Sequence, residues 1–129
     1  MTQLQKFSNS PVKASSMIGT NLFSHKGDSL GDIKEVVIDP DSGRVAYVVV
    51  SFGGFLGLGE KLFAIPFSAI EYNGDKGEYV LDVAQDRLKE APGFDPEHWP
   101  SMADEKWNRN IYTFYGRPPY WEEGRDYLY

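Results

Sequence analysis

One stretch decides the fold class of this 129-residue chain: Arg44-Val45-Ala46-Tyr47-Val48-Val49-Val50-Ser51-Phe52. Its β-branched and aromatic residues favour a strand. Residues 45–50 are all apolar, whereas a strand with one buried face alternates apolar and polar side chains. Both faces of this strand need cover, because an uncovered face would be an exposed apolar patch. Two covers stay open: the aromatic C-terminal part of the chain, or a second copy of the chain.

Short strands separated by turns lie on both sides of this stretch. The predicted strands are residues 21–23, 30–39, 44–52, 61–65, 70–72 and 78–82. The turn Asp39-Pro40-Asp41-Ser42-Gly43 has proline, aspartate and glycine where a tight turn needs them. Asn73-Gly74-Asp75-Lys76-Gly77 is typical of a hairpin connection. Six short strands with no helix between them predict a mainly β fold, a small antiparallel barrel or sandwich.

The last part of the chain, residues 84–129, has a different composition. It holds five of the eight prolines and all three tryptophans. Ser101-Met102-Ala103-Asp104 matches a capping box at the start of a helix. Apolar residues then recur every fourth position from Ala103 to Tyr115, which predicts a helix with one apolar stripe, ended by Gly116.

These patterns divide the chain into three segments. Residues 1–11 are polar and predict a flexible N-terminal arm. Residues 12–83, with 10 of the 13 glycines, form the β domain. Residues 84–129 form a short helical, aromatic-rich C-terminal extension, which we expect to pack on the β domain or on a second subunit.

Composition excludes several classes of protein. The longest apolar run has six residues, far fewer than the ~20 that a membrane span needs, and the N-terminus lacks the apolar core of a signal peptide. The absence of cysteine excludes disulfides, thiolate metal sites and iron–sulfur clusters. The net charge of −6 argues against a nucleic-acid partner. We expect a cytoplasmic protein, in solution or peripheral to a membrane, with no integral membrane segment.

No motif for catalysis or metal binding stands out. The glycines of residues 53–59 lie between two strands without the pattern of a phosphate loop, so a hairpin loop is expected there. The turn at 39–43 lacks the later ligands of a calcium loop. His25 and His98 are 73 positions apart, and spacing singles out no carboxylates to complete a zinc site. We therefore expect no catalytic residue, no metal and no cofactor.

Candidates for contact with a protein partner lie in two places. In the glycine-rich loop they are Phe55, Leu56 and Leu58, which form a partner-binding tip or pack under the C-terminal segment. In the C-terminal segment the candidates are Trp99, Trp107, Tyr115, Tyr120 and Trp121. Such aromatic residues suit packing on the β domain or a dimer interface. The acidic charge of the segment disfavours base stacking.

Five pieces of residues 12–83 together resemble a known family. They are Ser16-Met17-Ile18-Gly19, Gly27-Asp28-Ser29-Leu30-Gly31-Asp32-Ile33, residues 36–45, residues 53–61 and Ile65-Pro66-Phe67-Ser68-Ala69-Ile70. In this order they are similar to the PRC-barrel domain, found in the photosynthetic reaction-centre H subunit and the ribosome maturation factor RimM. The resemblance implies a small six-stranded antiparallel β-barrel and no catalytic motif. Residues 84–129 resemble the tail of small stand-alone bacterial members.

This resemblance implies function through interaction. We expect a soluble stand-alone PRC-barrel protein that acts as a non-catalytic adaptor or assembly module, binds a protein partner and forms a homodimer. One alternative is a peripheral accessory of a membrane electron-transfer complex, similar to the reaction centre. Another is a small-ligand-binding protein or an enzyme, which would need a deep polar pocket with a perturbed titratable group.

Overall fold

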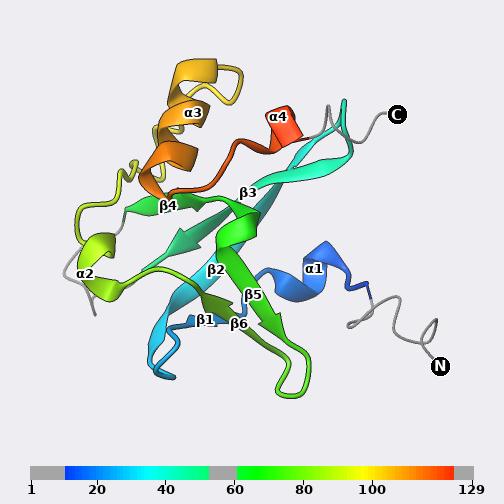
Figure 1. Cartoon of the computed structure of the whole chain (residues 1–129), viewed down its shortest axis with the longest axis vertical. Coiled ribbons are helices and arrows are strands. Elements are labelled where there is room, and N and C mark those ends of the chain that lie inside the picture. The colour runs from blue at the N-terminus through cyan, green and yellow to red at the C-terminus, as the bar shows by residue number, and fades with distance from the viewer. Residues whose placement is uncertain (1–10, 53–60, 124–129) are drawn as a thin grey trace.

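The structure, a computed structural model, describes residues 11–52 and 61–123 (Figure 1). Its centre is a six-stranded sheet with the strand order β4-β3-β2-β1-β6-β5. The strands are β1 (Asn21–Phe23), β2 (Ser29–Asp39), β3 (Arg44–Ser51), β4 (Leu62–Ile65), β5 (Ile70–Asn73) and β6 (Glu78–Leu81). The helices are α1 (Ala14–Met17), the 3-10 turn η3 (Phe67–Ala69), α2 (Gln85–Leu88), α3 (Glu105–Phe114) and α4 (Tyr120–Glu123). The prediction of a mainly β fold with six strands is confirmed.

The expected closed, all-antiparallel barrel is wrong in two respects. Strands β1 and β6 run parallel, with Leu22 opposite Tyr79, so the sheet is mixed. Strands β4 and β5 end the strand order, and no ladder joins them within the described ranges. The outer edge of β4 pairs instead with Phe94, because Leu62 and Phe94 exchange two backbone hydrogen bonds of 2.8 Å. Pro66 then ends β4, since proline has no N–H to donate to a further partner strand.

Strand β3 lies in the core of the protein, as its sequence indicates. It pairs with β2 on one side and β4 on the other, and all residues from Ala46 to Val50 are buried. Successive side chains of a strand point to opposite faces, so both faces of β3 are covered. Over one face lies α3, where the rings of Tyr47 and Trp107 meet edge to face with centroids 5.5 Å apart. This cover comes from the same chain.

Helix α3 begins at an aspartate. The Asp104 side chain accepts hydrogen bonds from the backbone N–H groups of Lys106 and Trp107, which makes Asp104 the N-cap. The predicted capping box begins three residues too early, since residues 101–104 form a turn before the helix. At the other end, Gly116 has a φ of 68° and its N–H bonds the Thr113 carbonyl. This left-handed ending favours glycine and directs the chain back over the sheet.

No helix in residues 11–52 and 61–123 is long and apolar enough to cross a membrane.

Candidate functional site

A groove of about 900 Å³ opens between the β2–β3 hairpin and the C-terminal helices. We name it the hairpin–helix groove. The residues that line it are Val37, Ile38, Asp39, Pro40, Asp41, Ala46, Tyr47, Met102, Ala103, Glu105, Asn108, Arg109, Tyr120, Trp121 and Glu122. Figure 1 shows the short helix α4 beside the far end of the hairpin, with α3 nearby. Residues more than 60 positions apart in the sequence therefore form this one surface.

Hydrogen bonds hold α4 against the hairpin. Arg44 donates from Nη1 to the Tyr120 carbonyl oxygen at 3.0 Å, and the Tyr120 hydroxyl donates to Asp39 Oδ2 at 2.7 Å. The bond from Tyr120 is the main reason that the pKa of Asp39 lies below its ordinary value. Burial, reinforced by the neighbouring Asp39 carboxylate, raises the pKa of Tyr120. Tyr120 therefore acts as a neutral donor that fixes the position of α4.

An arginine holds α4 against α3. Arg109 forms ion pairs with Glu105 at 3.1 Å and with Glu122 at 3.0 Å, and its guanidinium lies 5.6 Å from the ring centre of Trp121. The hydrogen bonds that Arg109 donates to the two carboxylates raise its pKa. These contacts place the Trp121 ring in the wall of the groove.

The groove combines apolar surface with an excess of acidic groups. Ile38 and Met102 are 49% and 37% exposed, unusually high for large apolar side chains. Its acidic lining residues are Asp39, Asp41, Glu105 and Glu122, and its basic lining residue is Arg109. Such a surface suits a ligand that carries both an apolar side chain and a positive charge.

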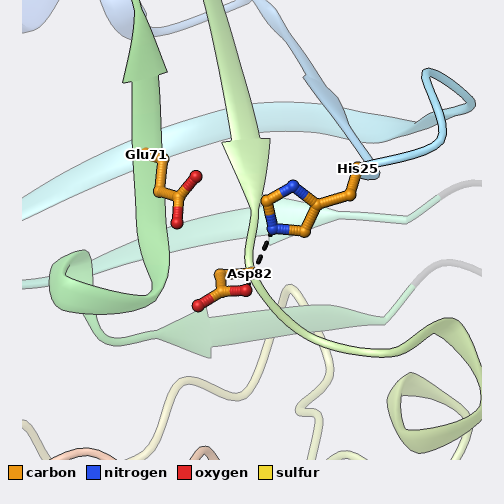
Figure 2. A group of neighbouring side chains, drawn as sticks. All are labelled: His25, Glu71 and Asp82. Carbon is orange, nitrogen blue, oxygen red and sulfur yellow. Dashed lines mark hydrogen bonds and ion pairs between the residues drawn. The ribbon is translucent and has the colours of Figure 1, made fainter.

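A second group of polar side chains lies at another part of the sheet. His25, Glu71 and Asp82 each offer one ligand-type atom, and these atoms lie within 4.8 Å of one another. Figure 2 shows the three side chains converging, with a bond of 3.0 Å between His25 Nε2 and Asp82 Oδ1. All three residues are exposed. We name them the His25 cluster.

Strand order explains why the His25 cluster exists. His25 lies in the turn that follows β1, and Asp82 directly follows β6. Because β1 and β6 are parallel, both strands end at the same edge of the sheet. Strand β5 runs antiparallel to β6, so its second residue, Glu71, lies at this edge as well.

Asp82 has a further partner outside the cluster. Its Oδ2 accepts a hydrogen bond from Arg117 at 2.9 Å, while Oδ1 faces His25. Hydrogen bonds from His25 and Arg117 hold the pKa of Asp82 below its ordinary value. The carboxylate is thus ionised and held in a fixed orientation.

The aromatic candidates of the C-terminal segment lie in different environments. Tyr120 and Trp121 line the hairpin–helix groove. Trp107 packs on Tyr47, and Trp99, which is 40% exposed, packs on Phe94.

Tyr115 does not line the groove. Tyr115 is buried, which raises its pKa, and its hydroxyl has no hydrogen-bond partner in the described part of the chain. Phe55, Leu56 and Leu58 lie outside the described residues.

Sequence reasoning missed Ile38, Met102 and Arg109 as groove residues, and it missed the His25 cluster. Ile38 belongs to a predicted strand, and nothing local distinguishes its exposed side chain from the buried ones nearby. His25 and Asp82 are 57 positions apart, so no short motif contains both. Only the parallel pairing of β1 with β6 could have indicated the cluster.

Comparison with known proteins identifies the region that contains the sheet. The PRC-barrel domain family matches residues 12–88, more than half of the chain. A protein of Deinococcus radiodurans, described as an uncharacterized protein, is 25% identical over 73 residues. These cover 57% of this chain and 26% of the relative, so the match spans about a quarter of the relative's length. The matched family region contains the whole sheet and the His25 cluster, whereas α3 and α4 lie beyond it.

Proposed function

This chain belongs to the PRC-barrel domain family, and from this premise we propose that it is a non-catalytic protein-interaction module. Its partner is a protein segment that binds in the hairpin–helix groove. The segment carries an apolar side chain next to lysine or arginine. The protein acts as an adaptor or assembly factor through this contact.

The observation that supports the proposal is the composition of the groove. Tyrosine, tryptophan, methionine and arginine are enriched in protein interfaces, and all four line the groove. Ile38 and Met102 leave apolar area there for a partner to cover.

The charge of the lining supports a basic partner. Among the residues that the structure describes, four carboxylates line the groove against one guanidinium. Arg109 is already paired with two of these carboxylates, those of Glu105 and Glu122. The Asp39 carboxylate accepts a hydrogen bond from Tyr120, a neutral group, and so keeps its negative charge. Complementary charge would steer a basic segment toward this acidic lining.

Selection from a random peptide library on the immobilised protein tests this function. We expect the enriched peptides to combine a basic residue with an aromatic or aliphatic one. Ile38→Arg should weaken their binding at least ~tenfold, because it replaces an apolar contact with a charge that repels the basic residue of the peptide, and a tenfold loss corresponds to ~1.4 kcal/mol. Ile38 is half exposed, so the protein should stay folded.

The chain offers a matched control for this substitution. Ile18 is 43% exposed and does not line the groove, so Ile18→Arg should leave peptide binding unchanged. Equal binding by the wild type and Ile38→Arg would exclude the groove as the interaction surface.

We further propose that the protein is cytoplasmic and forms a homodimer. Its exposed apolar side chains, which include Val12, Ile18 and Phe67, give area that a second copy could cover. Light scattering at micromolar concentration should give twice the chain mass of 14.6 kDa. A monomer mass under these conditions would contradict the dimer and leave the peptide groove to be judged by its own test.

A further inference from the structure

We propose that the His25 cluster is a binding site for a divalent transition-metal ion, with Zn²⁺ as the probe. The three side chains come from the β1–β2 turn, strand β5 and the residue after β6. None of them lines the hairpin–helix groove, so the metal site does not depend on the proposed interaction function.

The donor set suits such an ion. A neutral imidazole and two carboxylates are ligands that zinc accepts, and the imidazole favours transition metals over calcium or magnesium. Three protein ligands leave a fourth position of a tetrahedral ion open to water or to another molecule. The exposure of all three residues gives the ion a direct path of entry.

The geometry requires only small side-chain movements. The ligand atoms already lie within 4.8 Å of one another, and a tetrahedral zinc ion with ligands at ~2.0–2.1 Å places them roughly 3.3 Å apart. His25 Nε2 and Asp82 Oδ1 are at 3.0 Å, close to this spacing. Glu71 needs to move toward the pair, and exposed glutamate side chains rotate freely.

The distribution of hydrogen bonds leaves the ligand atoms available. Asp82 Oδ2 is taken by Arg117, so Oδ1 is the atom that faces the cluster. In metal sites, hydrogen-bond partners such as Arg117 orient the side chains that coordinate the ion. In Figure 2 the Glu71 carboxylate lies beside the imidazole without a bond to it. A metal ion would replace the hydrogen that His25 Nε2 and Asp82 Oδ1 share, and would add Glu71 as a third ligand.

The second histidine provides an internal contrast. His98 lies 3.6 Å from Asp95 three positions earlier, and both are exposed. That pair has no third ligand among the residues that the structure describes, where only the His25 cluster brings three such groups together. Both histidines therefore lie beside one carboxylate. The third group, Glu71, distinguishes the His25 cluster from the His98 pair.

Calorimetric titration of the untagged full-length protein with zinc chloride at neutral pH tests the site. We expect one Zn²⁺ per chain. His25→Ala and Glu71→Gln should each weaken binding at least ~tenfold, the loss that removal of even an outer-shell partner commonly gives. Both residues are exposed, so the variants should fold, and circular dichroism checks this.

Matched variants control for nonspecific binding. His98→Ala removes another exposed imidazole beside one carboxylate, and Glu90→Gln removes one exposed carboxylate; both variants should bind zinc as the wild type does. Imidazole NMR signals should show His25, and not His98, shifting with the titration. Absence of zinc binding, equal loss in His98→Ala, or full binding by Glu71→Gln would each overturn the metal site.

Discussion

The hairpin–helix groove and the His25 cluster are built on one sheet by different means. Side-chain contacts from outside the sheet create the groove, because α3 and α4 must pack on β3 and on the β2–β3 hairpin. Backbone pairing creates the cluster, because β1, β6 and β5 end at a common edge. One sheet thus carries a surface formed by an added segment and another formed by strand order, to which the added segment contributes Arg117, the partner of Asp82.

The family match follows the same division. It ends at residue 88, so it includes the complete His25 cluster and only the hairpin side of the groove. Changes to α3 that leave Arg117 on Asp82 should therefore affect the groove and spare the cluster, whereas changes to the pairing of β1 should do the reverse. Three substitutions test this separation, and we give them in order of decreasing effect.

The largest effect is expected from Ile111→Ala on α3. Ile111 is 2% exposed, and truncating a fully buried isoleucine costs about 2–5 kcal/mol of unfolding free energy. Urea unfolding measures this cost, with the exposed Thr113→Ala on the same helix as the control. Below the unfolding transition, peptide binding should weaken while zinc binding stays unchanged. A cost below about 0.5 kcal/mol would mean that α3 does not stabilise the sheet.

A smaller effect on stability is expected from Gly31→Ala on β2. Here zinc binding, and not peptide binding, should weaken. Gly31 lies opposite Leu22 of β1, and a Cβ there would lie 1.9 Å from the Ser51 carbonyl oxygen. Backbone must shift to relieve this clash, at a cost of about 1–3 kcal/mol. The shift should displace the β1–β2 turn and weaken zinc binding.

The exposed position Lys34 on the same strand gives the control, and Lys34→Ala should change neither stability nor zinc binding. A Gly31→Ala protein with wild-type zinc affinity would show that the cluster does not depend on the position of β2, the strand that pairs with β1.

The smallest effect is expected from Tyr120→Phe, which removes one hydrogen bond between α4 and the hairpin. Loss of the bond to Asp39 should cost about 1 kcal/mol at neutral pH. The bond lowers the pKa of Asp39 in the folded state, so its contribution is present above the ordinary aspartate pKa of 3.8 and is lost as the pH falls through the lowered value. Urea unfolding of both proteins from pH 7 to pH 2.5 should therefore show their difference shrinking below about pH 4. A difference that stays constant over this range would contradict the role of Asp39.

Much of the sheet could be predicted from local sequence. The apolar run of β3, the Asp39–Gly43 turn and the glycine-rich connections mark the six strands because strand propensity and turn conformation depend on a few neighbouring residues. Asp104 and Gly116 likewise mark the ends of α3, although the sequence pattern placed the cap three residues early.

Strand partners were harder to predict than strands. Local patterns favour hairpins between neighbouring strands, and this holds for β2–β3, β3–β4 and β5–β6. Leu22 and Tyr79, which pair in the parallel ladder, are far apart in the sequence, so local propensity carries no information about their contact. The wrong prediction of an all-antiparallel barrel results from this lack of information about distant strand pairs. The His25 cluster was not predicted for the same reason.

Side-chain polarity and backbone preference along the chain account for the β class, the positions of the strands and the need to cover both faces of β3. The tertiary structure sets which strands pair, that α3 lies over Tyr47, and which exposed side chains converge. The physical reason is that these features arise from contacts between distant residues, whose free energy depends on the packing of the whole chain.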